Sequence, residues 1–156
     1  MKFIIAILSL ILFFTCAWAQ EATVTTDKLE YSQGESVKIT LKNNSTQSIF
    51  SHIGGTSSGF GIRYAEKKTS SGNWEKLFTY CQYPHCIRDI GPPEEMKSGE
   101  SNTYEWDPLI YIDGTEKSIK ADPGTYRLVV SYQIRNSASS EDWKWLTVNS
   151  NEFIIK

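Results

Sequence analysis

Residues 122–132 read Asp-Pro-Gly-Thr-Tyr-Arg-Leu-Val-Val-Ser-Tyr, and this stretch predicts the fold. The Pro-Gly pair favours a tight turn, and the residues after it alternate in the manner of a strand with one buried face. A tyrosine delivered onto such a strand by a turn can bond through its hydroxyl to nearby backbone. We therefore expect Asp122, Pro123, Gly124 and Tyr126 to form a structural corner that opens a long strand.

Strands with the same period of two recur through the rest of the chain. Val37, Ile39 and Leu41 alternate with polar residues, and no segment shows the spacing of a capped helix. Trp74 and Trp106 are expected in the core. Similar short runs occur at residues 62–64, 74–77, 103–107, 126–132, 143–148 and 153–155. The pattern predicts seven to nine short strands, and so an all-β, antiparallel β-sandwich.

The first 19 residues have the form of a secretory signal peptide. Lys2 precedes an apolar run, Phe3–Phe14, and Ala17-Trp18-Ala19 is an A-x-A cleavage site. We expect cleavage near Ala19 and a secreted or periplasmic protein without a transmembrane segment, because the apolar run is shorter than the roughly 20 residues that span a bilayer. The alternative is a lipoprotein modified at Cys16, but the preceding Phe and Thr fit a lipobox poorly.

Residues 20–156 are expected to form one domain, since this length supports a single hydrophobic core. Without Lys2, 15 of the 16 basic residues remain against 18 acidic ones, a net charge of −3. Nucleic-acid binders cluster Lys and Arg on one face or tail, so this composition argues against a nucleic-acid partner.

Two cysteines remain after the expected cleavage, Cys81 and Cys86. An even number in an exported chain favours one disulfide, which here would close a short loop containing Tyr83 and His85. The alternative is a metal site formed by Cys81, His85 and Cys86, but it needs a fourth ligand and a reducing compartment. We therefore expect neither a metal nor a cofactor.

Residues 55–59, Gly-Thr-Ser-Ser-Gly, match the G-x-S-x-G pattern of hydrolase nucleophile elbows. That pattern places its serine on a strand-to-helix turn, whereas here an alternating strand follows. We interpret the match around Ser57 as accidental, name no catalytic residue and expect a protein that is not an enzyme.

Trp143 and Trp145 lie two residues apart, so both side chains share one face of a strand, and Leu146 and Val148 share the other. Only one of these faces can lie in the core. The interpretation we favour buries the tryptophans. If they are exposed instead, Trp143 and Trp145, with Tyr83 and His85 of the cysteine loop, form the candidate binding surface.

Residues 31–45, with a tyrosine, a Gly-Glu turn and an Asn-rich turn, resemble the opening of bacterial immunoglobulin-like domains. The resemblance continues at residues 72–77, 97–100 and 123–128. It implies an immunoglobulin-like β-sandwich without common catalytic residues. Export, a single sandwich domain and the absence of a credible catalytic set together predict a protein that binds a protein or cell-envelope partner. The chain also resembles the bacterial intracellular proteinase-inhibitor family. That second resemblance implies an alternative function, an exported protease inhibitor acting through the Cys81–Cys86 loop.

Overall fold

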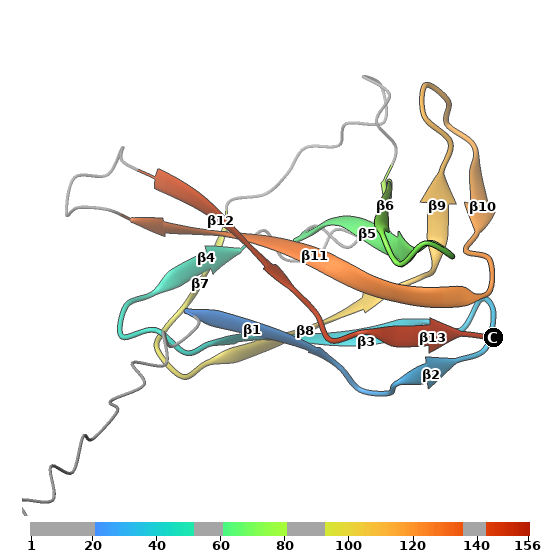
Figure 1. Ribbon diagram of the computed structural model, residues 1–156. Coiled ribbons are helices and arrows are strands. Elements are labelled where there is room, and N and C mark those ends of the chain that lie inside the picture. The colour runs from blue at the N-terminus through green and yellow to red at the C-terminus, as the bar shows by residue number, and fades with distance from the viewer. Residues whose placement is uncertain (1–20, 52–60, 81–92, 136–142) are drawn as a thin grey trace, which may run out of the picture.

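The computed structural model of the protein describes residues 21–51, 61–80, 93–135 and 143–156. These residues form two β-sheets packed face to face and a separate two-stranded hairpin, with no helix among them (Figure 1). The expected fold class, an all-β immunoglobulin-like sandwich, is confirmed. The described residues contain thirteen strands rather than seven to nine, because several strands span only two or three residues and are too short to show an alternating pattern.

Sheet I has three antiparallel strands in the order β1-β3-β8. They are β1 (Ala22–Thr26), β3 (Val37–Asn43) and β8 (Ser101–Trp106). In β3 the buried and wet residues alternate strictly, as the sequence predicts for a sheet with one solvated face.

Sheet II is built around the twelve-residue strand β11 (Gly124–Arg135). One side of β11 pairs with β12 (Trp143–Asn149) and then β13 (Phe153–Ile155), and the other side pairs with β5 (Ile62–Lys68) and β4 (Ile49–Ser51). Three strands extend the sheet: β6 (Trp74–Leu77) beside β5, β7 (Glu94–Met96) beside β4, and β2 (Glu30–Tyr31) parallel to β13.

A separate hairpin of β9 (Leu109–Tyr111) and β10 (Ser118–Lys120) stands beside β6, as Figure 1 shows. A single bridge between Phe78 and Tyr111 joins it to the segment that follows β6.

A β-bulge changes which side chains of β5 face the core. Val129 pairs with Tyr64, but Val130 pairs with Ile62, so one extra residue of β5 is inserted between them. Ile62 is buried in the core, whereas Tyr64 lies opposite Val129 on the outer face. The simple alternation that places Ile62 and Tyr64 on one face is therefore wrong at this point.

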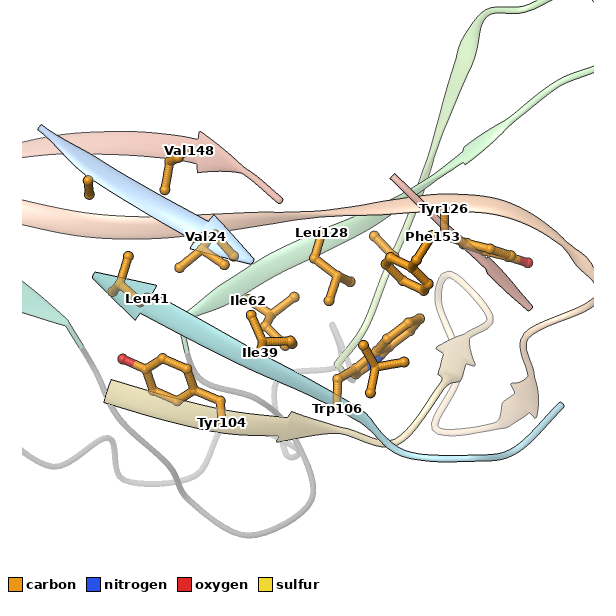
Figure 2. Close-up of a cluster of buried hydrophobic side chains, with 14 of the residues drawn as sticks. Val24, Ile39, Leu41, Ile62, Tyr104, Trp106, Tyr126, Leu128, Val148 and Phe153 are labelled. Atoms are coloured by element: carbon orange, nitrogen blue, oxygen red, sulfur yellow. The ribbon is translucent and has the colours of Figure 1, made fainter. Parts of the chain in front are cut away.

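The core lies between the two sheets, and Figure 2 shows its centre. Phe153 joins three aromatic rings there, lying 5.5 Å from Tyr31, 6.1 Å from Tyr126 and 6.4 Å from Trp106 between ring centroids. Trp106 is 2% exposed, so its expected place in the core is confirmed. Such aromatic pairs add to the free energy of area burial.

At the start of β11 the Tyr126 hydroxyl donates a 2.6 Å hydrogen bond to the carbonyl oxygen of Asp122. This is the geometry of a tyrosine corner, in which the ring is buried and the hydroxyl fastens the incoming loop. Burial raises the pKa of Tyr126 to about 12.

Candidate binding surface

The sequence predicts a candidate binding surface of four residues, Trp143, Trp145, Tyr83 and His85. The structure describes two of them, Trp143 and Trp145. Tyr83 and His85, with Cys81 and Cys86, lie outside the described residues, as does Ser57. Trp143 and Trp145 lie on β12, whose register with β11 decides which way they face.

The register turns both tryptophans away from the core. Leu146 pairs with Tyr132 and Val148 with Val130, and Tyr132, Val130 and Val148 are core residues. The alternate residues of β12 therefore lie on the outer face of sheet II. Trp145 is 54% exposed. The favoured interpretation, with the tryptophans in the core, is wrong: Leu146 and Val148 fill that space.

Trp143 forms an aromatic cluster with a residue from the other side of β11. Its indole meets the ring of Phe50 on β4 edge to face, with centroids 4.8 Å apart and planes at 89°. The guanidinium of Arg135 lies 4.7 Å from the Trp143 ring and 5.2 Å from the Phe50 ring. We call Phe50, Arg135, Trp143 and Trp145 the tryptophan end of the outer face.

A second group of rings and cations covers the opposite part of this face. The Arg127 guanidinium lies 4.2 Å from the Trp74 ring and bonds Glu66 through Nε at 2.5 Å. Lys76 Nζ lies 4.5 Å from the Tyr64 ring. Trp74 was expected in the core, and this expectation is wrong, because Trp74 pairs with Lys68 on the outward side of β6.

Between the two groups lies Val129, which is only 3% exposed yet is not part of the core cluster. It pairs with Tyr64 on one side and Asn149 on the other, both on the outer face. An apolar side chain is therefore buried on the outer face of sheet II as well as in the core between the sheets.

The outer face of sheet I has a different character. Its exposed or half-exposed residues on β3 and β8 are Lys38, Thr40, Lys42, Ser101, Thr103 and Glu105. Neither aromatic nor large aliphatic side chains occur among them, so the two outer faces differ in chemistry.

Sequence reasoning did not find the roles of Phe50, Tyr64, Trp74 and Arg135 on this surface. Each aromatic ring meets a cation from another strand, either the neighbouring strand or, for Trp74 and Arg127, the next strand beyond β5. The spacing along one strand carries no information about that register. The bulge in β5 also places Tyr64 on the opposite face from the one that a strict alternation with Ile62 predicts.

Within the described ranges, no three residues of the His, Cys, Asp and Glu types are grouped so that they could hold a metal ion. A search of the same ranges for a helix long and apolar enough to cross a membrane finds none.

Comparisons with known proteins identify no family. No protein-family model matches the chain, and no curated protein matches it. Among solved structures, the chain is similar to the ASH/PapD-like domain 7 of human CEP192, with 10% identity, a TM-score of 0.35, and coverage of 87% of this chain and 85% of that one. It is also similar to part of a β-glucosidase from Listeria innocua, with 20% identity and a TM-score of 0.31, over 86% of this chain and 16% of the enzyme. Likenesses this weak say nothing about function, and the assignment of an immunoglobulin-like sandwich rests on the strand pairing and the tyrosine corner.

Proposed function

We propose that this protein is an exported, non-catalytic immunoglobulin-like domain that binds a protein or cell-envelope partner through the outer face of sheet II. Export is inferred from the signal-peptide pattern of residues 1–19. The observation that carries the choice of surface is the tryptophan end, where Trp145 is 54% exposed beside the cluster of Phe50, Arg135 and Trp143.

Side chains of these types are the ones that bind partners most strongly. Trp, Tyr and Arg are enriched among the residues that dominate binding energy, since they bury large areas and combine apolar bodies with polar groups. The Arg135 guanidinium also lies within cation–π distance of two rings. These contacts restrict it, so less conformational entropy is lost when its N–H groups bond a partner.

The two outer faces provide a matched experiment. A photo-reactive amino acid at Gln133, on the outer face between Phe50 and Trp145, should cross-link the partner in cells that produce the protein. The same amino acid at Thr103, on the outer face of sheet I, should not. Trp145→Ser and Arg135→Ala should each reduce the Gln133 cross-link, while Lys42→Ala should leave it unchanged.

Equal cross-linking from Gln133 and Thr103, or a Gln133 cross-link that survives both substitutions, would remove this surface from consideration. The non-catalytic part of the proposal is tested separately by a screen for hydrolase activity. Activity that disappears in Ser57→Ala would contradict it.

The protease-inhibitor alternative places the contact in the Cys81–Cys86 segment. A panel of extracellular proteases assayed with and without reductant separates the two functions. Inhibition that is lost when Cys81 and Cys86 are both replaced by Ser would favour the alternative, whereas no inhibition at micromolar protein would exclude it.

A further inference from the structure

The tryptophan end of the outer face carries a positive charge that no described carboxylate balances. Arg135 is exposed, and its side chain contacts two aromatic rings but forms no ion pair within the described part of the chain. Two other cations of the same face have carboxylate partners, since Lys68 Nζ lies 3.2 Å from Glu152 and Arg127 bonds Glu66. Covering Arg135 with an uncharged partner would bury an unpaired charge, which is unfavourable, so an anionic partner fits this end best.

The guanidinium of Arg135 has the geometry to bind a carboxylate. It carries five N–H donors in one plane, and its contacts with the rings of Phe50 and Trp143 are cation–π contacts that use no oxygen acceptor. A carboxylate accepts two of these N–H groups side by side, and a charge-assisted pair of this kind is stronger than a neutral hydrogen bond. The anion that suits Arg135 is therefore a carboxylate.

The exposed part of Trp145 lies next to this guanidinium. Trp143 pairs with Arg135 and Trp145 pairs with Gln133, so Trp145 and Arg135 are diagonal neighbours on one face. Diagonal neighbours in a sheet are about 7–8 Å apart, a distance that long side chains span. A single small unit can consequently lie on the exposed part of the Trp145 indole and extend a carboxylate to Arg135.

The surroundings of Trp145 suit a sugar ring. The face of an indole carries the negative part of its quadrupole, which attracts hydrogen atoms that bear a partial positive charge. One side of a pyranose ring presents such C–H groups, while its hydroxyl groups lie around the rim. Gln133 opposite Trp145, and Thr147 two residues further along β12, offer an amide and a hydroxyl that can bond those hydroxyl groups.

We propose that the tryptophan end binds an acidic polysaccharide, with one uronic acid unit lying on Trp145 and its carboxylate accepting two hydrogen bonds from Arg135. This inference rests on the function proposed above, since it uses the same surface and names the chemistry of a cell-envelope partner. Without Lys2 the chain has 15 basic and 18 acidic residues, so its overall charge does not attract a polyanion. Recognition therefore depends on the local contacts.

Isothermal titration calorimetry with defined oligosaccharides tests the proposal. The probes are the tetrasaccharides of galacturonic, mannuronic and glucuronic acid, with maltotetraose as the neutral sugar and tetraglutamate as a carboxylate without a sugar ring. At least one uronate should bind the wild-type protein, and the neutral sugar should bind about tenfold more weakly, the value of one charge-assisted hydrogen bond. Tetraglutamate should bind more weakly than that uronate.

The variants separate the two parts of the site. Arg135→Ala and Trp145→Ser should each weaken uronate binding by about tenfold or more. Arg135→Lys keeps the charge but not the planar fork, and its affinity should fall between those of wild type and Arg135→Ala. Lys76→Ala is the matched control, because it removes a cation that also lies over a ring of this face but at the opposite end, and it should leave binding unchanged. Urea unfolding confirms that each variant is folded.

The outcomes distinguish this proposal from the function on which it rests. If none of the uronates binds at millimolar concentration, but the Gln133 cross-link forms and is lost in Trp145→Ser, the polysaccharide is overturned and the surface remains. If both fail, the surface is overturned as well. Tetraglutamate that binds as tightly as the best uronate would favour a protein partner and overturn the sugar, and uronate binding that survives Arg135→Ala would overturn the site.

Discussion

The hydroxyl of Tyr126 and the carbonyl oxygen of Asp122 are 2.6 Å apart, and this single bond fixes the loop that leads into the longest strand. The ring below it is 1% exposed and stacks on Phe153. The corner therefore couples a loop at the surface to the aromatic centre of the core.

Removing the hydroxyl tests that coupling. Tyr126→Phe should lower the free energy of unfolding by about 1 kcal/mol, the usual net value of one such bond. Asp122→Ala is the matched control, because the acceptor is the backbone carbonyl and the bond survives the loss of the side chain. Urea denaturation measures both variants. A Tyr126→Phe variant as stable as wild type, or an equally large effect of Asp122→Ala, would contradict this role.

The buried tyrosines predict how stability falls in alkali. Burial raises the pKa of Tyr126 to about 12 and also raises the pKa of Tyr31, Tyr104 and Tyr132 above the ordinary value of 10.0. Between the unfolded and folded pKa values the native state holds more protons than the unfolded state, so stability is complete below pH 10 and decreases as pH rises toward 12. The decrease should be shallower in Tyr126→Phe, measured by urea midpoints across this range. Identical slopes for the two proteins would be evidence against a shifted Tyr126.

Two turns with the same construction lead toward strands of sheet I. Gly99 has φ of 82°, and the carboxylate of Glu100 accepts a bond from Lys97 N at 2.7 Å; Gly34 and Glu35 repeat this arrangement, with Ser32 N as the donor. A Cβ at Gly99 would meet nothing within 4 Å, so Gly99→Ala tests backbone strain alone.

Gly99→Ala should destabilise the fold by about 1 kcal/mol, because a side chain is unfavourable at positive φ. Gly99→Asn should cost less, since asparagine tolerates this conformation better. Thermal unfolding of the two variants gives the comparison. Equal stability of Gly99→Ala and wild type would show that the turn relaxes.

Asn43 and Asn44 are neighbours with opposite surroundings. Asn43 is fully buried, and its Nδ2 donates to the carbonyls of Gln47 at 2.8 Å and Met96 at 2.9 Å. Asn44 is exposed and bonds Thr23. Asn43→Ala should cost about 2–3 kcal/mol because it leaves buried polar groups without partners, whereas Asn44→Ala should change stability by less than about 0.5 kcal/mol. Chemical denaturation measures the free energy of unfolding of both variants. Similar losses of stability at the two sites would be inconsistent with the buried hydrogen bonds of Asn43.

The fold was predictable from sequence where one face of a strand is apolar and the other polar. The alternation in β3 and the turn before Tyr126 each permit one orientation, and the structure has that orientation. The short strands β4 and β7 and the parallel pairing of β2 with β13 were not predictable, since two or three residues carry no period and the pairing is non-local.

The candidate binding surface shows why the orientation of β12 could not be predicted from the sequence. Both faces of β12 are apolar, one with Trp143 and Trp145 and the other with Leu146 and Val148, so the pattern within the strand cannot say which face is buried. The register with Tyr132 and Val130 decides it, and register is a property of two strands. The larger residues were assumed to lie inside, but the space there fits the smaller ones.

The central claim is that β12 presents its tryptophans outward, and solvent exposure of the four indoles that follow the expected cleavage site, those of Trp74, Trp106, Trp143 and Trp145, measures this directly. In an NMR spectrum of ¹⁵N-labelled protein at low concentration, a soluble paramagnetic agent broadens each indole signal according to its exposure, with assignments from Trp→Phe variants. The account predicts strong broadening for Trp145, 54% exposed, and the least for Trp106, 2% exposed. A Trp145 signal as protected as that of Trp106 would place the tryptophan face of β12 in the core and contradict both the surface and the function proposed for it.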